Sequence, residues 1–226
     1  RCQVLRVYVA VAMLRDVVQR HNVGNVASLV GLLRHPMGNA GSLFSVKKFA
    51  AALKGEGLAI AKDTVHQLLD YVQDCFLVRP VWMETDSERQ RMVNPRKAYP
   101  VDLGLIPVFD RTGRANTGHA LETVVLIELE RRRAEVMYVK TAAGYEVDFL
   151  ARYPDGHQEL IQVCADAGDA ATMEREIRAL VEAGAAFPKA ARRLLTLTAG
   201  GSPVAVPRGV TAQAAYAWLL APPAGP

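Results

Sequence analysis

Three short extended stretches lie close together in the second half of the chain, and they limit its possible folds more than any other feature. They cover residues 135–140, 146–152 and 159–164. The sequences Ala143-Gly144 and Pro154-Asp155-Gly156 separate them and are typical of tight turns. Because strands joined by short turns usually lie side by side, the pattern predicts one sheet that contains all three.

Helical patterns flank these strands. One covers residues 120–132 and another covers 173–183. A short strand at 194–198 and a last short helix at 211–220 follow. The order helix, three strands, helix and strand predicts a mixed sheet flanked by helices.

The first half of the chain is mainly helical in pattern. Apolar residues at helical spacing indicate a helix over residues 4–20. They are Val4, Val7, Val11, Leu14 and Val18. Asn25 is expected to cap a second helix that ends at Pro36. Ser45 is expected to cap a third helix, and a fourth covers 62–75.

Two further extended stretches, 76–82 and 97–102, enclose the polar segment 84–96. Helix, turn, helix and then a two-stranded ribbon is the order of a winged helix-turn-helix. Pro100 cannot donate to a strand ladder, so we expect its strand to lie at an edge or to break there.

The polar, Gly-bearing stretch 109–118 is the best domain boundary. A chain of 226 residues is long enough for one large domain or two small ones. We therefore predict an α+β chain with two domains. A helical winged helix-turn-helix covers residues 1–110, and an α/β domain with a mixed sheet covers 111–226.

Composition excludes several classes of protein. No apolar run approaches the roughly 18 residues of a membrane span, and no secretion signal is evident. Three widely spaced cysteines without CxxC spacing argue against a disulfide framework and a zinc site. Free thiols in a reducing cytoplasm are the expectation.

The given sequence begins at Arg1, which already lies within an apolar helical pattern, so we expect a fragment of a longer protein.

Eight short motifs, in order along nearly the whole chain, carry a family resemblance. They are Leu14-Arg15-Asp16-Val17, Arg20-His21, Ser42-Leu43-Phe44-Ser45-Val46, Lys62-Asp63-Thr64-Val65, Tyr99-Pro100-Val101-Asp102-Leu103-Gly104, Leu121-Glu122, Glu146-Val147-Asp148-Phe149 and Leu160-Ile161-Gln162-Val163-Cys164. Together they resemble the C-terminal half of bacterial and archaeal AAA-superfamily ATPases, a half known chiefly as a domain of unknown function.

The resemblance implies a winged helix followed by a restriction-endonuclease-like domain of the PD-(D/E)xK type. It also implies a preceding P-loop ATPase domain that uses ATP and Mg²⁺. This chain contains no GxxxxGK[ST] motif, which would cradle the phosphates. We therefore expect no ATP hydrolysis and no cofactor of its own. The expected partners are DNA, the ATPase domain of the same protein, or another protein.

Basic residues on the predicted winged helix are candidates for DNA contact, because Lys and Arg neutralise phosphates. They are Lys47, Lys48, Lys62, Arg89, Arg91, Arg96 and Lys97. The net charge of +4 is compatible with a nucleic-acid partner without being diagnostic of one. The alternatives are a solvated loop or a winged helix that contacts proteins.

The PD-(D/E)xK resemblance implies a candidate Mg²⁺ site. In that family an Asp and an acid on the next strand hold the metal, and a helix Glu often supports it. Asp148 matches the Asp and Glu122 the helix Glu, so these two are weak metal candidates. Glu146, two positions before Asp148, is expected on the same face of a regular strand.

Two central positions of that site are replaced. Gln162 stands where the second acid belongs and Cys164 where the Lys belongs. Neither supplies the charge that Mg²⁺ chemistry needs, although Lys140 is a candidate substitute for the Lys. We therefore predict a non-catalytic accessory region. The alternative is a Mg²⁺-dependent nuclease that uses Glu122, Glu146 and Asp148. A third reading is a structural domain that contacts the ATPase.

Overall fold

The computed structural model describes residues 2–109, 117–199 and 204–222. The chain forms two compact units. The N-terminal unit comprises Arg1–Val81 and Val93–Ala115, and the C-terminal unit comprises Trp82–Met92 and Asn116–Pro226. The predicted boundary at 110 and 111 lies outside the described residues. No helix in the described part of the chain is both long and apolar enough to cross a membrane.

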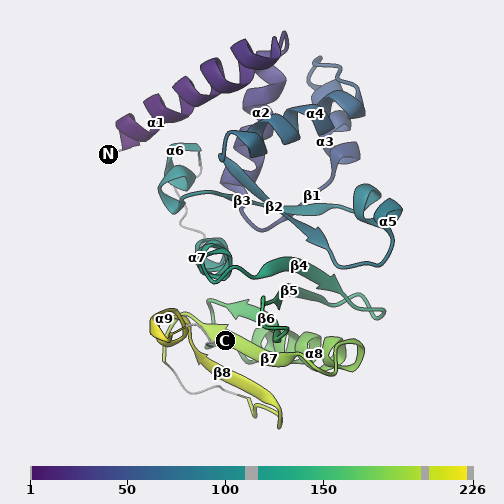
Figure 1. Cartoon of the computed structure of the whole chain (residues 1–226), viewed down its shortest axis with the longest axis vertical. Helices are drawn as coiled ribbons and strands as arrows, with labels where there is room; N and C mark the ends of the chain where they lie inside the picture. The colour runs from purple at the N-terminus through teal and green to yellow at the C-terminus, as the bar shows by residue number, and fades with distance from the viewer. Residues whose placement is uncertain (1, 110–116, 200–203, 223–226) are drawn as a thin grey trace. The chain divides into compact units, whose positions relative to one another are not determined.

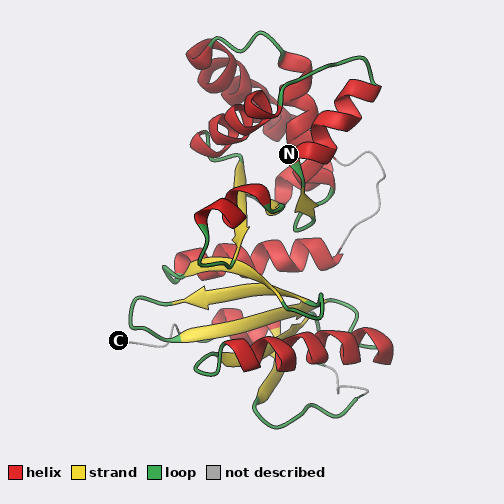
Figure 2. Ribbon diagram, turned by 90° about the vertical axis from the view of Figure 1, so that its right-hand side faces the viewer, coloured by secondary structure: helices red, strands yellow, loops and turns green. Residues whose placement is uncertain are grey.

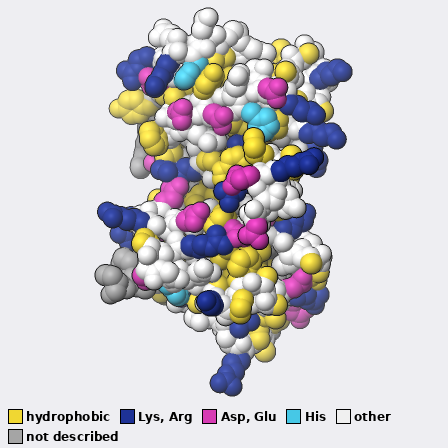
Figure 3. All heavy atoms as spheres, turned by 45° about the vertical axis from the view of Figure 1, so that its right-hand side comes forward, with side chains coloured by type: hydrophobic (Ala, Val, Ile, Leu, Met, Phe, Trp, Pro, Cys, Tyr) yellow, Lys and Arg dark blue, Asp and Glu magenta, His cyan; other side chains and the backbone are white. Residues whose placement is uncertain are grey.

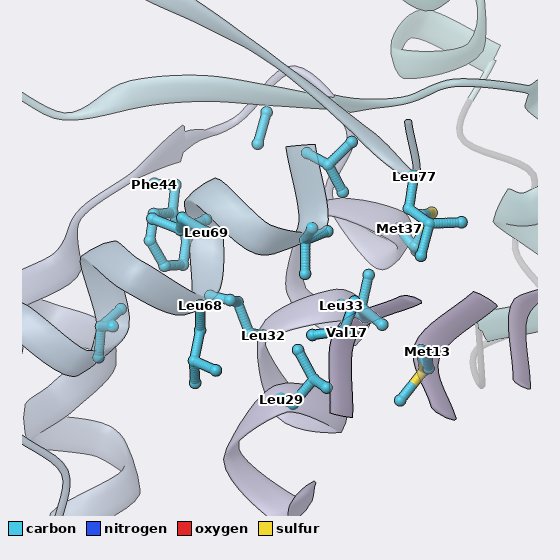
Figure 4. Close-up of a cluster of buried hydrophobic side chains, with 14 of the residues drawn as sticks. Met13, Val17, Leu29, Leu32, Leu33, Met37, Phe44, Leu68, Leu69 and Leu77 are labelled. Atoms are coloured by element: carbon cyan, nitrogen blue, oxygen red, sulfur yellow. The ribbon is translucent and has the colours of Figure 1, made fainter. Parts of the chain in front are cut away.

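Helices build most of the N-terminal unit (Figure 1). They are α1 (Cys2–Val11), η1 (Ala12–Gln19), α2 (Val26–Gly38), α3 (Val46–Gly55) and α4 (Lys62–Asp74). Their shared core includes Val17, Leu29, Leu32 and Leu68, which are all but inaccessible to solvent (Figure 4). Burial of such side chains stabilises each by about 1.5–3 kcal/mol, so this core holds the helices together.

The predicted helix caps are confirmed in this unit. The side chain of Asn25 accepts a hydrogen bond from the backbone N–H of Ser28, and that of Ser45 accepts one from Lys48. The predicted end of α2 at Pro36 is wrong, because the helix continues to Gly38. Proline disfavours helical geometry at the preceding residue, but here the packing of the buried Met37 outweighs that preference.

The face of the first helix that packs in the core is not the apolar face that its sequence pattern predicts. Val9, Met13 and Val17 are its buried residues, whereas the apolar stripe that begins at Val4 and Val7 is largely exposed. A wide π-helical turn begins at Ala12, so the helix also loses its regular α-helical spacing there. Apolar residues therefore occupy two faces of this segment, and only one of them packs in the core.

A small antiparallel ladder completes the N-terminal unit. Strand β3 (Arg96–Pro100) lies between β1 (Leu43–Phe44) and the first residues of β2 (Val78–Met83). Pro100 is the last residue of β3 and pairs only with β2, which confirms the expected break. After β3, the short helices η2 (Leu103–Leu105) and α6 (Ile106–Phe109) follow.

A mixed sheet forms the centre of the C-terminal unit (Figures 1 and 2). Its order is β4 (Glu135–Lys140), β5 (Glu146–Arg152), β6 (Gln158–Cys164), β7 (Ala191–Thr196) and β8 (Val210–Ala214). The first three strands are antiparallel, and β6, β7 and β8 run parallel. Trp82 and Met83, the end of β2, pair with β4. The predicted α+β class with a mixed sheet is confirmed.

Helices cover this sheet. Helix α8 (Ala170–Ala186) packs on β5, β6 and β7, over a core that includes Leu160. Helix α7 (Thr117–Arg131) contacts β4 and β6, and α9 (Ala215–Leu220) contacts β7 and β8. Ile161 points away from the face of Leu160 and is also fully buried, so both faces are covered.

Two further elements differ from the sequence prediction. The polar segment after β2 contains a short helix, α5 (Glu88–Val93), which the pattern did not indicate. Residues 211–220 were predicted as one helix, but their first part is strand β8, which pairs in parallel with β7. The β-branched residues Val210 and Thr211 suit a strand, and pairing with β7 decides the conformation there.

Candidate functional site

A β-bulge in β5 shapes the region where the nuclease-like residues lie. The register between β4 and β5 shifts between Met137 and Val139. As a result, Val147 and Leu150 both join the core beneath α8, although residues three apart in a regular strand point to opposite faces. The bulge therefore changes which side chains of β5 share a face.

Beyond the bulge, Asp148 and Gln162 link β5 to β6 through their side chains. The last paired residues of these strands are Phe149 and Ile161, and Asp148 and Gln162 come next. The backbone N–H of Asp148 donates to Gln162 Oε1 (3.2 Å), and the N–H of Val163 donates to Asp148 Oδ2 (3.0 Å). Both side chains are almost fully buried. Hydrogen bonds made by these two side chains therefore link β5 and β6 beyond the point where the backbone pairing ends.

Glu176 of α8 completes this cluster, and it was not among the predicted site residues. Gln162 Nε2 donates to Glu176 Oε2 (2.6 Å), and Arg175 Nη2 donates to Glu176 Oε1 (2.6 Å). Burial raises the pKa of Glu176 above its ordinary value, and the charge of Asp148 adds to that effect. One signal was visible in the sequence, since Glu176 interrupts the apolar stripe of Met173, Ile177 and Leu180. We call Asp148, Gln162 and Glu176 the carboxylate–amide cluster.

Cys164 lies beside this cluster and is buried. Burial raises the pKa of its thiol to about 11, and Glu176 and Asp166 contribute to the shift. A thiol in this state is neutral at physiological pH and is a poor nucleophile and metal ligand. It cannot supply the positive charge that a Lys would bring to this position.

The other nuclease-like candidates are Glu146, Lys140 and Glu122, and they differ in burial. Glu146 alternates with the buried Val147, whose side chain joins the α8 core, so the regular alternation that would place Glu146 beside Asp148 is interrupted by the bulge. Lys140 is exposed and stands opposite Glu146 in the β4–β5 register. Glu122 is half-buried on α7. Within the described residues, no group of three or more His, Cys, Asp or Glu could hold a metal ion.

The predicted DNA-contacting residues differ in their exposure to solvent. Lys47, Lys48, Lys62 and Arg89 are exposed. Arg91 is half-buried and pairs with Glu88. On the face shown in Figure 3, Lys and Arg side chains are interspersed with Asp and Glu.

Arg96 and Lys97 are buried in β3, with 4% and 2% of their surface accessible. The guanidinium of Arg96 donates to His66 Nδ1 (3.1 Å) on α4. Burial lowers the pKa of Arg96, although Asp70 partly offsets this effect. In this conformation both side chains are buried within the N-terminal unit, so neither is exposed to a phosphate backbone. Their contact with DNA stays a prediction.

The outer face of α4 is acidic. Its buried residues, such as Val65 and Leu69, face the core. The exposed residues on the opposite side are Asp63, Gln67, Asp70 and Asp74. Negative side chains repel phosphates, so this helix is poorly suited to lie in a DNA groove.

A second buried carboxylate, Glu159, lies in the C-terminal unit. Burial would raise its pKa, but Arg193 and Tyr153 outweigh that effect and the pKa is lowered. Tyr153 donates its hydroxyl to Glu159 (2.8 Å), and the guanidinium of Arg193 donates two hydrogen bonds. This arrangement satisfies a buried charge and is typical of a structural ion pair.

Comparison with known proteins identifies the family. The family model of a domain of unknown function, DUF8612, matches residues 1–114. The chain belongs to this family. It is also similar to the uncharacterized protein MJ1544 of Methanocaldococcus jannaschii, with 31% identity over 185 residues. These residues make up 80% of this chain and 40% of the relative, so the chain spans less than half the length of that protein. No solved structure matches.

The predicted membership in a family of unknown function is thus confirmed at that level. Neither comparison names an ATPase or a nuclease. Those parts of the resemblance stay predictions.

Proposed function

We propose that this chain is a non-catalytic docking region of a longer AAA-type ATPase that works in the cytoplasm. In this proposal a winged-helix unit is followed by a nuclease-like unit whose site is closed. The observation that carries the proposal is the hydrogen bond from Gln162 to Glu176, because it engages the neutral side chain that stands where the resemblance expects the second metal-binding acid.

The order of elements supports both parts of the proposed fold. In the N-terminal unit, α2, β1, α3, α4, β2 and β3 follow one another, and β1 pairs with β3 as in a winged helix. In the C-terminal unit, a helix precedes three antiparallel strands, and a second helix leads to a parallel strand. That order agrees with the PD-(D/E)xK resemblance.

The side chains of the site do not suit Mg²⁺. This ion prefers charged oxygen ligands in octahedral geometry. Gln162 is neutral, and its amide oxygen already accepts from the N–H of Asp148. Asp148 accepts from Val163, and Glu176 is bonded to Gln162 and Arg175. We therefore assign no catalytic step to this cluster.

Docking to protein is better supported than docking to DNA. The exposed face of α4 is acidic, and two of the expected cations are buried. The relative is much longer than this chain, which is compatible with further domains such as the proposed ATPase. We propose that domain as one partner, and a weak contact between DNA and the exposed lysines as a lesser one.

A cleavage assay tests the proposal. Purified chain is incubated with supercoiled and single-stranded DNA in Mg²⁺ or Mn²⁺, beside an Asp148→Ala variant. We expect no cleavage above the buffer background from either protein. Metal-dependent cleavage that disappears in the Asp148→Ala variant would contradict the proposal and would favour the nuclease alternative.

A further inference from the structure

Arg192 of β7 is a cation to which the described part of the chain offers no acceptor. Leu194, two residues further along the strand, joins the core beneath α8, so Arg192 points to the same side of the sheet. Its side chain is half-buried, and its guanidinium carries only N–H donors. Within residues 2–109, 117–199 and 204–222, no hydrogen bond or ion pair engages them. The neighbouring Arg193, by contrast, donates to the carboxylate of Glu159. The donors of Arg192 are therefore left for water or for a ligand.

Two glycines leave room for this guanidinium. A Cβ atom added at Gly184 of α8 would lie 2.8 Å from Cδ of Arg192 and 3.2 Å from Nη1. One added at Gly209, before β8, would lie 2.5 Å from Nη2. Glycine inside a helix is destabilising relative to alanine, and the space that Gly184 gives to Arg192 is a reason for it here. We call the space beside these two glycines the Arg192 slot.

Two further cations lie at the same end of the sheet. Strands β7 and β8 run side by side in parallel, with Arg192 opposite Val210 (Figure 1). Lys189 lies two residues before the start of β7, and Arg208 two residues before the start of β8. Because neighbouring parallel strands start at the same edge, both residues belong to the edge at which Arg192 lies. Both are exposed, and neither has an acceptor among the residues that the structure describes.

Acidic residues of the neighbouring elements have other partners. Asp155, in the turn before β6, accepts from the backbone N–H of His157 at 2.9 Å. Glu182 of α8 accepts from the backbone N–H of Ala143, in the turn between β4 and β5. The C-terminal end of α8 adds only about half a negative elementary charge. A net positive charge therefore remains at this edge of the sheet.

We propose that the Arg192 slot binds the phosphate group of a small molecule, with charge added by Lys189 and Arg208. The planar fork of an Arg matches two phosphate oxygens, and three cations suit a dianion better than a single carboxylate. The cations gather around one guanidinium at one end of two strands, which fits one phosphate group better than the repeated phosphates of a nucleic acid. The site is independent of the carboxylate–amide cluster and goes beyond the docking function proposed above.

Phosphorus NMR tests the proposal with inorganic phosphate, titrated against the full chain in low-salt buffer. We expect saturable binding with a Kd of about 1 mM and a Kd about tenfold higher in Arg192→Met, which lacks the charge. Arg133→Met is the control. It makes the same change at an exposed residue before β4, and β5 and β6 separate β4 from β7. We expect this control to bind phosphate as the unaltered chain does.

Gly184→Ala separates the position of the guanidinium from its charge. The added Cβ would displace the flexible end of Arg192, whereas alanine favours the helix, so the chain stays folded by circular dichroism. We expect this variant to bind phosphate about fivefold more weakly, although its net charge is unchanged.

Any of three results would overturn the proposal. The first is an unaltered chain that shows no saturable binding up to about 20 mM phosphate. The second is an unchanged Kd in folded Arg192→Met or folded Gly184→Ala. The third is a loss of affinity for duplex DNA in Arg192→Met that equals its loss for phosphate, which would assign the slot to a nucleic-acid backbone.

Discussion

Gln162 joins β6 to α8 by donating its side-chain amide to Glu176, with 2.6 Å between Nε2 and Oε2. The same amide group accepts from the backbone of Asp148 through its oxygen. An amide is both donor and acceptor, whereas a carboxylate only accepts. Gln162 therefore satisfies two groups that a Glu at this position could not satisfy together.

We predict that Gln162→Glu destabilises the C-terminal unit by about 2–4 kcal/mol at neutral pH, because a buried carboxylate would then face Glu176 without a donor between them. The measurement is urea unfolding. Gln158→Glu is the control, since it makes the same change at a half-buried position of the same strand and should cost much less. Equal losses in the two variants would show that the bond to Glu176 contributes little. Recovery of stability in Mn²⁺ would show that an acid at this position creates a cation site.

The titration of Glu176 gives a second prediction. Its pKa in the folded chain is raised above the ordinary 4.5, mainly by burial, so the folded state binds a proton more readily than the unfolded state. Stability contributed by this group is therefore present below about pH 4.5 and is lost as the pH rises through the folded-state pKa. Glu176→Gln removes the titrating group. We expect the difference in unfolding free energy between variant and parent to grow in the variant's favour as the pH rises over this window, as measured by urea unfolding. A difference that does not change with pH would contradict the assignment.

Glu159 should behave in the opposite way. Its pKa is lowered because the ion pair with Arg193 and the hydrogen bond from Tyr153 outweigh burial. It contributes stability above about pH 4.5 that is lost as the pH falls through the folded-state pKa. We expect Arg193→Met to cost about 3 kcal/mol at neutral pH, because it leaves a buried charge without its cation. Arg178→Met, at an exposed position beside Tyr145, should change the melting temperature little. A comparable effect of both variants on thermal unfolding would contradict this account.

Local sequence signals predicted much of the fold. Strands β4 and β5 occupy the predicted residues, because one turn sequence separates them and another follows β5. The caps at Asn25 and Ser45 were also correct, since they depend on contacts within one turn of helix. Strand β8 was missed, because a short stretch becomes a strand only when β7 lies beside it.

The candidate site was harder to predict for the same reason. Asp148 and Gln162 were found because they lie on neighbouring strands with a recognisable pattern. The β5 bulge interrupts the alternation on which the placement of Glu146 beside Asp148 depends, and it arises from pairing with β4 rather than from a local signal. Glu176 reaches the cluster from a helix 14 residues further along the chain than Gln162, which strand alternation cannot indicate. Arg96 and Lys97 were predicted to be surface cations, although both are buried, because burial depends on the tertiary fold rather than on the local sequence.

The last prediction separates the exposed from the buried cations of the N-terminal unit. Binding to DNA through Lys47 and Lys48 would be weak, tolerant of sequence and strongly dependent on salt, because it would rest on phosphate contacts. We expect Lys47→Glu/Lys48→Glu to reduce the affinity for duplex DNA at low salt at least tenfold and to leave the melting temperature unchanged, since both side chains are exposed.

Arg96→Met should do the reverse, lowering stability by about 1–3 kcal/mol through the lost bond to His66, with little effect on the affinity of the protein that remains folded. His66→Ala tests the same hydrogen bond from the other side and should also leave the affinity nearly unchanged. Fluorescence anisotropy with a labelled duplex gives the affinities, and thermal unfolding gives the stabilities. An unchanged affinity after the double reversal would exclude these lysines as the contact, and a large loss of affinity in a folded Arg96→Met protein would show that β3 opens to meet DNA.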